Sequence, residues 1–253
     1  QIHGAPALGP AMAPTPPRRE FEGALGVVVN HAPAFPGASD VALKLTPAGF
    51  LRWGRYTLNG AGGFTTRRAD EVERGLAAEI VRRGHLRMSL NFRVDGGRQE
   101  SDSPQLAGLG DIAMTVRGRL SARWEPEPGW QWGAGVSVDA LPRNKRLQWD
   151  GGLTRLWPLA PGSTLSAGVG ISGADTRYMQ TWHGVTAGQA ARSGYAVYAP
   201  RGGLRTAGLT ATWRHEFDAT WAVFVMSSYT RWVGDAARSP LTGKVSALSL
   251  IHI

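Results

Sequence analysis

The sequence contains no cysteine, and its 253 residues hold no long uninterrupted apolar run. Without cysteine, disulfides and thiolate metal sites are excluded. Without an apolar run of about 18 residues, no membrane-spanning helix is predicted. The motifs of zinc proteases, serine hydrolases and P-loop nucleotidases are also missing, and the six histidines are dispersed. We therefore expect no enzymatic activity, no cofactor and no metal site.

Lysine is scarce too. The chain has 25 arginines but only 3 lysines, and its net charge is +9. Such a charge is typical of proteins that bind nucleic acid or an anionic surface. A G+C-rich coding bias, which favours arginine over lysine, would give the same balance. The arginines form no run longer than two, so composition alone does not choose between these explanations.

What the sequence has in abundance is two-residue alternation. In DIAMTVRGRLSARW (111–124), apolar residues and one glycine take the even positions, while Arg117, Arg119 and Arg123 share the other face. This pattern is typical of a β-strand with one apolar face. It recurs along the chain and predicts eleven strands, at 23–30, 41–53, 55–65, 75–83, 85–95, 111–124, 129–140, 146–158, 163–173, 204–216 and 220–232.

The links between these strands alternate between long and short. Short links fall at 54, 84, 125–128, 159–162 and 217–219, and the longest loop spans 174–203. This asymmetry is typical of outer-membrane barrels, whose periplasmic turns are short and whose outer loops are long. Beside the short links lie Trp53, Trp124, Trp130, Trp157 and Trp221, and at the opposite strand ends lie Trp149 and Trp232. Tryptophans at both membrane interfaces, in two girdles, have this distribution.

A soluble sandwich also alternates, but its polar face meets water and its apolar face meets a second sheet. In a transmembrane barrel the apolar face meets lipid and the polar face meets the lumen. An arginine facing lipid at mid-membrane costs about 2–4 kcal/mol, so the alternation assigns the faces. The predicted fold is all-β: an antiparallel up-and-down transmembrane β-barrel in the bacterial outer membrane.

The polar face supplies a set of candidate lumen residues, which are Arg87, Arg93, Arg117, Arg119, Arg123, Glu79, Asp139 and Asp150. Two interpretations remain open. Around an open pore the arginines would select anions. In a narrow barrel they would instead pair with the acidic residues and fill the interior. A barrel of about this many strands lies between filled eight-strand barrels and open sixteen-strand porins, so strand number does not decide.

Two loops carry further candidates. Glu100, Asp102 and Asp111 form an acidic cluster, which could hold a divalent cation that bridges lipopolysaccharide phosphates, or could cap turns through hydrogen bonds. The loop 174–203 is long enough to be functional, and Tyr178, Gln180 and Arg192 are its candidate residues. It could plug the barrel mouth or lie over it as a cap.

Several loop stretches resemble those of the MipA/OmpV family of Gram-negative outer-membrane proteins. They are PGASD (36–40), ESDSPQLAGLGD (100–111), YMQTWHGVTAGQAARSG (178–194) and VGDAARSP (233–240). The resemblance runs from about residue 23 to 244. It implies a barrel of about twelve strands, and the role attributed to some members: a scaffold that links a membrane-bound lytic transglycosylase to a peptidoglycan synthase. Other members are described as porin-like or adhesive.

The two ends of the chain depart from the barrel pattern. Residues 1–20 are rich in proline and alanine and predict an unstructured leader, followed by one barrel domain over 21–253. The family pattern ends in a last strand with a terminal aromatic, whereas this chain ends in LSLIHI (248–253), which a transposon-type sequencing adapter would encode. We expect the twelfth strand to be truncated or replaced, with residues 245–253 able to form a partial strand beside the first.

The sequence thus predicts a non-enzymatic outer-membrane scaffold that docks peptidoglycan-remodelling enzymes and contacts lipid and lipopolysaccharide, with no nucleic-acid partner. The alternative is a porin-like channel that passes small polar or anionic solutes through an arginine-lined lumen.

Overall fold

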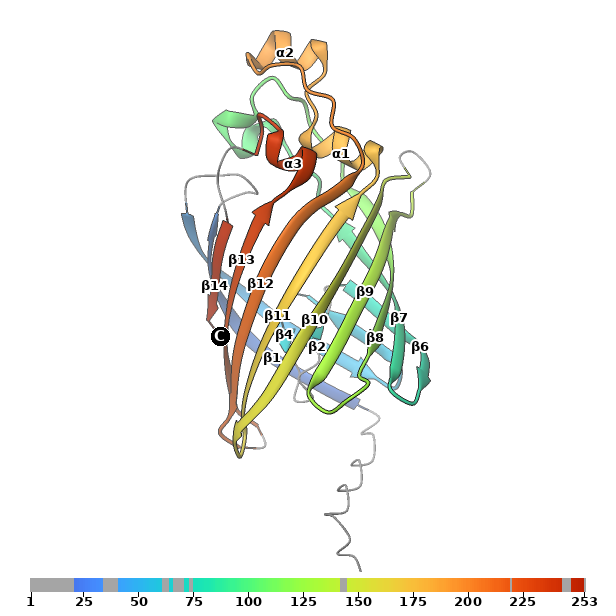
Figure 1. The fold of residues 1–253 in the computed structure, drawn as a ribbon. Coiled ribbons are helices and arrows are strands. Elements are labelled where there is room, and N and C mark those ends of the chain that lie inside the picture. The colour runs from blue at the N-terminus through green and yellow to red at the C-terminus, as the bar shows by residue number, and fades with distance from the viewer. Residues whose placement is uncertain are drawn as a thin grey trace, which may run out of the picture.

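A computed structural model shows a closed antiparallel barrel with helices gathered at one end (Figure 1). The structure describes residues 21–33, 41–60, 64–65, 71–72, 75–141, 145–218, 220–242 and 247–252. Within these ranges twelve strands form the barrel, in the order β1-β14-β13-β12-β11-β10-β9-β8-β7-β6-β3-β2. Their bounds are β1 Phe21–Pro33, β2 Val41–Trp53, β3 Tyr56–Asn59, β6 Gly75–Arg83, β7 Leu86–Asp95, β8 Thr115–Trp124, β9 Trp130–Asp139, β10 Leu147–Ala160, β11 Ser163–Ala174, β12 Gly203–Glu216, β13 Ala222–Trp232 and β14 Ala247–His252.

The turns at the end opposite the helices are short, as predicted. Trp53 pairs with Tyr56, and Arg83 pairs with Leu86, so each of these hairpins closes through two residues. The first turn residue is Gly54 in one and Gly84 in the other, with φ of 56° and 54°. A two-residue hairpin turn that matches strand twist needs positive φ, and glycine adopts it without strain.

Two predicted strands have different limits. The predicted strand 55–65 ends at Asn59, and β4 (Phe64–Thr65) pairs instead with β5 (Glu71–Val72) as a separate two-stranded sheet. The predicted strand 111–124 begins only at Thr115. Ile112 exchanges backbone hydrogen bonds of 3.0 and 2.7 Å with Arg98, so the residues before Thr115 belong to a loop rather than to the wall.

The last strand closes the barrel. β14 pairs with β13 from Val225 to Thr230, and with β1 at Val29, Asn30 and His31. The predicted partial strand at 245–253 therefore lies beside the first strand over its described residues. The predicted leader, residues 1–20, lies outside the described residues.

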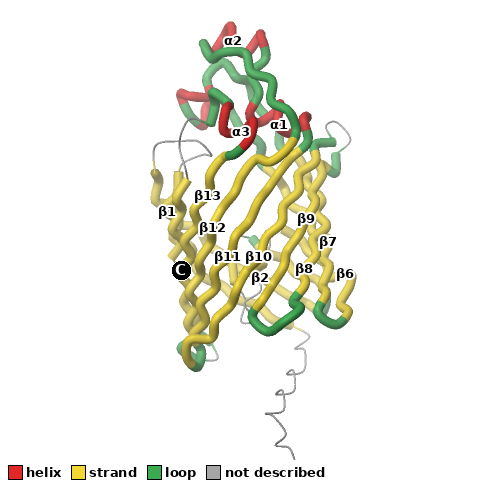
Figure 2. The backbone as a smooth tube through the Cα atoms, viewed as in Figure 1, coloured by secondary structure: helices red, strands yellow, loops and turns green. Residues whose placement is uncertain are grey.

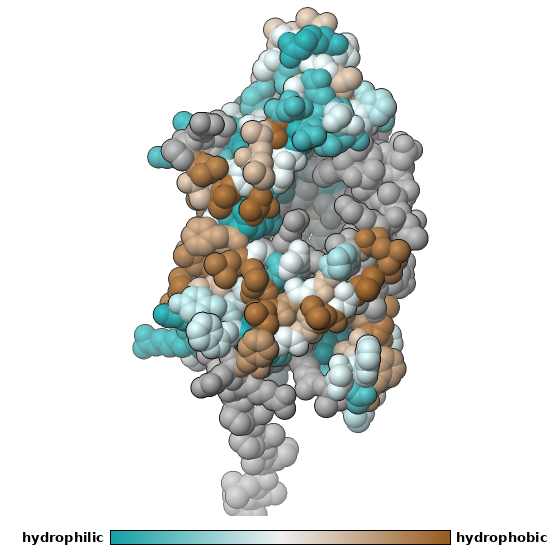
Figure 3. Space-filling model, turned by 180° about the vertical axis from the view of Figure 1, so that it is seen from behind, coloured by the Kyte–Doolittle hydropathy of each residue, from teal (hydrophilic) through white to brown (hydrophobic). Residues whose placement is uncertain are grey.

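The outer wall is apolar and the inner wall polar. On β8, Leu120 is 43% exposed on the outside, whereas Arg117 on the opposite face is 1% exposed. Figure 3 shows apolar residues gathered on the barrel wall and hydrophilic ones over the loops above it. Because backbone groups pair around a closed barrel, such a wall can face hydrocarbon without leaving an exposed sheet edge. Exposed apolar wall residues include Leu25, Leu45, Leu58, Leu76, Phe92, Val94, Val136, Val169, Ile171 and Leu209.

The tryptophans form a girdle at the short-turn end, where Trp53, Trp124, Trp130, Trp157 and Trp221 are all exposed. The guanidinium carbon of Arg155 lies 4.9 Å from the ring centroid of Trp130. The predicted upper girdle is wrong for one of its two members. Trp232 is half-buried and packs against a hydrophobic cluster in the barrel mouth, because it lies on the inward face of β13.

The helices are α1 (Thr176–His183), α2 (Ala187–Ser193) and α3 (Gly234–Arg238), with 3₁₀ turns η1 (Glu100–Asp102) and η2 (Pro104–Leu106). Figure 2 shows all of them at the end opposite the short turns. Two small apolar cores hold this cap together, one around Met179 and Ala236 and one around Leu109 and Val185. Among the described helices, none is long and apolar enough to cross a membrane.

Candidate functional site: the lumen and its capped mouth

A cavity of about 490 Å³ occupies the lumen. It reaches the short-turn end, where Gly54 and Arg55 line it, and extends upward to Ser172, Thr206 and Thr230. Because neither Arg117 nor Tyr178 is among its lining residues, the cavity ends below the layer that these two side chains form.

Charge in this cavity is predominantly positive. Among the described residues, the lining carries six guanidinium groups and three carboxylates: Arg52, Arg55, Arg82, Arg87, Arg119 and Arg123 against Glu22, Glu79 and Asp150. Several of them form ion pairs, which supports the narrow-barrel interpretation. Arg119 holds both carboxylate oxygens of Asp150, at 2.5 and 2.8 Å, and Arg82 donates to Glu79 at 2.7 Å.

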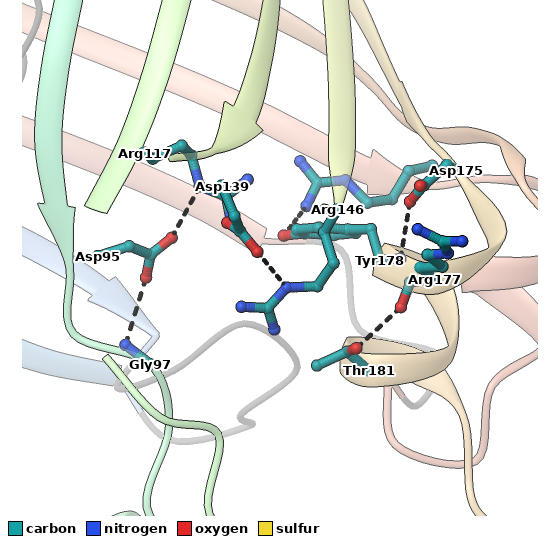
Figure 4. A network of polar contacts seen from close by, with 10 residues as sticks. Asp95, Gly97, Arg117, Asp139, Arg146, Asp175, Arg177, Tyr178 and Thr181 are labelled. Carbon is teal, nitrogen blue, oxygen red and sulfur yellow. Dashed lines mark hydrogen bonds and ion pairs between the residues drawn. The ribbon is translucent and has the colours of Figure 1, made fainter. Parts of the chain in front are cut away.

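Above the cavity lies a layer of buried charges (Figure 4). Arg117 lies 3.3 Å from a carboxylate oxygen of Asp95 and 3.3 Å from one of Asp139. The other oxygen of Asp139 accepts a hydrogen bond of 2.5 Å from Arg146. Arg117, Asp139 and Arg146 are all buried. Charges out of contact with water are tolerated only when they are paired, so these side chains are fixed by one another.

The long loop joins this layer through one aromatic side chain. Tyr178 of α1 is 6% exposed, and its ring centroid lies 5.4 Å from the Arg117 guanidinium and 5.2 Å from that of Arg205. Its hydroxyl accepts a hydrogen bond of 2.8 Å from Arg205. The Asp175 carboxylate accepts the Tyr178 backbone N–H and so caps the first turn of α1. The loop 174–203 therefore sends α1 into the mouth, while α2 lies farther out (Figure 1).

The candidate lumen residues occupy different levels. Arg87, Arg119, Arg123, Glu79 and Asp150 line the cavity, whereas Arg117 and Asp139 lie in the layer above it. Arg93 stands opposite Arg117 in the β7–β8 register, is exposed, and does not line the cavity.

The loop candidates have structural partners. Asp111 accepts the backbone N–H of Glu100 at 2.8 Å, Asp102 accepts that of Gln99 at 2.8 Å, and Glu100 accepts that of Gly110. These contacts favour turn capping over a cation site, and no cluster of metal-ligating residues is found in the part of the chain that the structure describes. Gln180 lies against Gly184 within the loop. Arg192 is exposed on α2.

Sequence reasoning missed two arginines of the mouth. Arg146 is the first residue of the predicted strand 146–158 but is not among the predicted lumen candidates, and in the structure it lies just before β10. Arg205 lies where the β11–β12 register shifts, since Ser172 pairs with Thr206 but Gly173 pairs with Leu204. The extra residue of such a bulge is turned relative to its neighbours, so simple alternation places its side chain on the wrong face. In the structure Arg205 reaches the Ser172 hydroxyl as well as Tyr178.

His183, at the end of α1, is the most strongly perturbed titratable group of the cap. Burial, which is the largest cause, and the positive charges of Arg205 and Arg98 together lower the pKa of its imidazole to about 3. The ring meets Trp232 edge-on, with centroids 5.0 Å apart. Among the described residues, neither ring nitrogen has a hydrogen-bond partner. His183 therefore acts as a neutral packing group.

A closed antiparallel barrel with an apolar outer wall, a tryptophan girdle and a polar lumen defines an integral β-barrel protein of the bacterial outer membrane. The model of one protein family, described as MltA-interacting protein MipA, matches residues 25–251. The chain belongs to the MipA family.

Solved structures similar to this chain are also outer-membrane proteins. OprD of Pseudomonas aeruginosa shows 9% identity with a TM-score of 0.31, over 85% of this chain and 80% of that one. A loop-deletion mutant of OmpT of Vibrio cholerae shows 7% identity with a TM-score of 0.39, over 92% of this chain and 99% of that one. A search of curated proteins gives no match.

Proposed function

We propose that this protein is a non-enzymatic outer-membrane scaffold that docks a periplasmic lytic transglycosylase through its short-turn rim. The observation that carries the proposal is the packed layer of Arg117, Tyr178 and Arg205 across the mouth, because a barrel filled at this level is poorly suited to conduction. The family description, MltA-interacting protein, supports a lytic transglycosylase as the partner. A peptidoglycan synthase would be a second partner of the same scaffold.

The short-turn rim has suitable docking groups. Glu127 and Pro128 are exposed on the β8–β9 turn, and Phe217 and Trp221 are exposed beside the β12–β13 turn. Aromatic side chains at an exposed rim supply large contact area when a partner covers them.

The test is capture of a purified lytic transglycosylase by the full chain in detergent. The variants are Glu127→Arg, on the rim, and Phe217→Ser, which removes an exposed aromatic. Arg177→Glu is the matched control, because Arg177 is exposed on α1 at the opposite end. We expect capture by the parent and by the control, and at least tenfold weaker capture by the rim variants. Absence of binding, or equal loss in the control, contradicts docking at this rim.

A second candidate function is a channel for small anions, and the excess of arginine in the cavity favours it. Single-channel recording separates the two functions. Steady anion-selective steps from the parent protein would overturn a purely scaffolding role, whereas a silent bilayer that contains folded protein supports it.

A further inference from the structure

The lumen cavity has two unlike walls. One wall, from β7 and β8, presents the guanidinium groups of Arg87, Arg119 and Arg123. On the facing wall, from β11 to β13, none of the described residues that line the cavity is charged: they are Gly170, Ile171, Ser172, Thr206, Gly208, Thr210 and Thr230. The charge is thus concentrated on one side, and hydrogen-bonding groups that carry no net charge stand on the other.

The strand register brings this charge next to open space. Directly paired residues, taken from β7 to β12, form the row Arg87, Arg123, Gly133, Gly152, Gly170 and Gly208. All six line the cavity. Paired residues on neighbouring antiparallel strands lie about 5 Å apart. Two guanidinium groups therefore begin a row whose next four members have no side chain, and at Gly133, which pairs with Arg123, an added Cβ would meet no atom within 4 Å.

The same register creates an electrostatic cost. Like charges directly opposite each other on paired strands are destabilising, and Arg87 stands directly opposite Arg123. Glu125 offsets part of this cost, at 3.7 Å from Arg87. The cavity as a whole still carries twice as many guanidinium groups as carboxylates among the described residues. An anion in the cavity would add a further counter-charge to this lining.

We propose that the cavity is a binding site for a small anion that carries carboxylate or phosphate groups and enters from the short-turn side. Guanidinium groups bind both kinds of oxyanion through paired hydrogen bonds. A volume of about 490 Å³ falls within the usual range of small-molecule sites. The hydroxyl group of Thr230 would donate to another oxygen of the ligand, whereas the hydroxyls of Ser172 and Thr206 are hydrogen-bonded to each other. Because the buried layer lies above the cavity, the site holds the anion rather than passing it onward.

The experiment titrates the folded full chain, in neutral detergent, with citrate and with inorganic phosphate by calorimetry. Arg123→Gln removes one charge of the row. Gly133→Leu fills the space, because a Cβ at Gly133 meets no atom within 4 Å and a side chain there fits the barrel. Arg192→Gln is the matched control, since it removes the same charge from exposed α2.

We expect citrate to bind the parent and the control equally, to weaken with added salt, and to bind each cavity variant at least tenfold more weakly. Absence of citrate and phosphate binding to the parent overturns the proposal. So does undiminished binding to folded Arg123→Gln or to folded Gly133→Leu. If one variant does not fold, as judged by heat-modifiable electrophoretic mobility, the other still decides.

A phosphate could belong to a free solute or to a lipid headgroup, and a repeat with phosphatidylglycerol added to the micelles separates these sources. Competition with citrate supports a headgroup, and unchanged citrate binding supports a free solute. The titration involves no protein partner, so its failure leaves the docking proposal standing, and failure of docking leaves the anion site standing.

Discussion

The guanidinium of Arg117 lies 5.4 Å from the ring centroid of Tyr178, although three strands, β9, β10 and β11, separate β8 from α1 in the sequence. This contact fastens the longest described loop to the barrel wall. It lies between an apolar loop core above and the cationic cavity below, so it decides whether the lumen is continuous.

Removal of the Tyr178 ring is expected to open the mouth. In planar bilayers, Tyr178→Ala should produce conductance steps that the parent protein lacks, because no other aromatic ring stacks on both Arg117 and Arg205 among the described residues. Tyr178→Phe should keep the layer and lose only the hydrogen bond from Arg205, worth about 2 kcal/mol. Tyr195→Phe, which loses a hydroxyl bond to Gln105 in the outer cap, is the control. Equal conductance in all variants contradicts the prediction.

Removal of the buried carboxylate of Asp139 should strongly reduce the free energy of unfolding. Asp139→Asn leaves Arg117 and Arg146 without their shared counter-charge, and breaking a buried ion pair costs about 3–5 kcal/mol. The free energy of unfolding into urea from lipid vesicles measures the effect. Arg238→Gln breaks an ion pair whose arginine is 70% exposed, so no measurable change is expected there. A small effect at Asp139 would mean that water reaches this layer.

The cap should weaken in acid because of His183. The folded pKa of about 3 lies below the ordinary value of 6.5, so folding favours the neutral ring. The resulting stability is complete above pH 6.5 and decreases steadily as the pH falls toward 3. NMR of labelled histidine should show a neutral His183 ring at pH 5, and thermal unfolding in detergent should move to lower temperature between pH 7 and pH 4. His183→Phe should reduce that pH dependence. A ring that protonates near pH 6.5 would contradict it.

Neighbouring residues on β8 offer a direct test of the membrane orientation. Leu120→Arg places a charge on the lipid side and should cost about 2–4 kcal/mol near mid-membrane. Ser121→Arg places the same charge in the cavity, which Ser121 lines, and should cost less. Folding free energies in lipid vesicles measure both. The reverse order would contradict the assignment of faces.

Much of this architecture follows from the sequence. The apolar positions of 111–124 identified the lipid-facing side of β8, and the tryptophans beside the short links identified one interface, because both signals are local consequences of a strand that repeats every two residues. Ion pairing of Asp150 with a lumen arginine was one of the two interpretations that the alternation left open, and the Arg119–Asp150 pair supports it. The limits of β3 and β8 did not, because loop contacts such as Arg98 with Ile112 compete with the strand pattern.

The sequence by itself determined the strand pattern of most of the wall, its two faces and the positive charge of the lumen, since each of these depends on residues close together in the chain. Only the tertiary structure decided that Tyr178 contacts Arg117 and that a bulge turns Arg205 inward. The same holds for the pairing of Arg87 with Arg123 and for the four glycines that follow them across the paired strands. Those relationships depend on strand register and on the packing of distant loops, and no local periodicity encodes either of them.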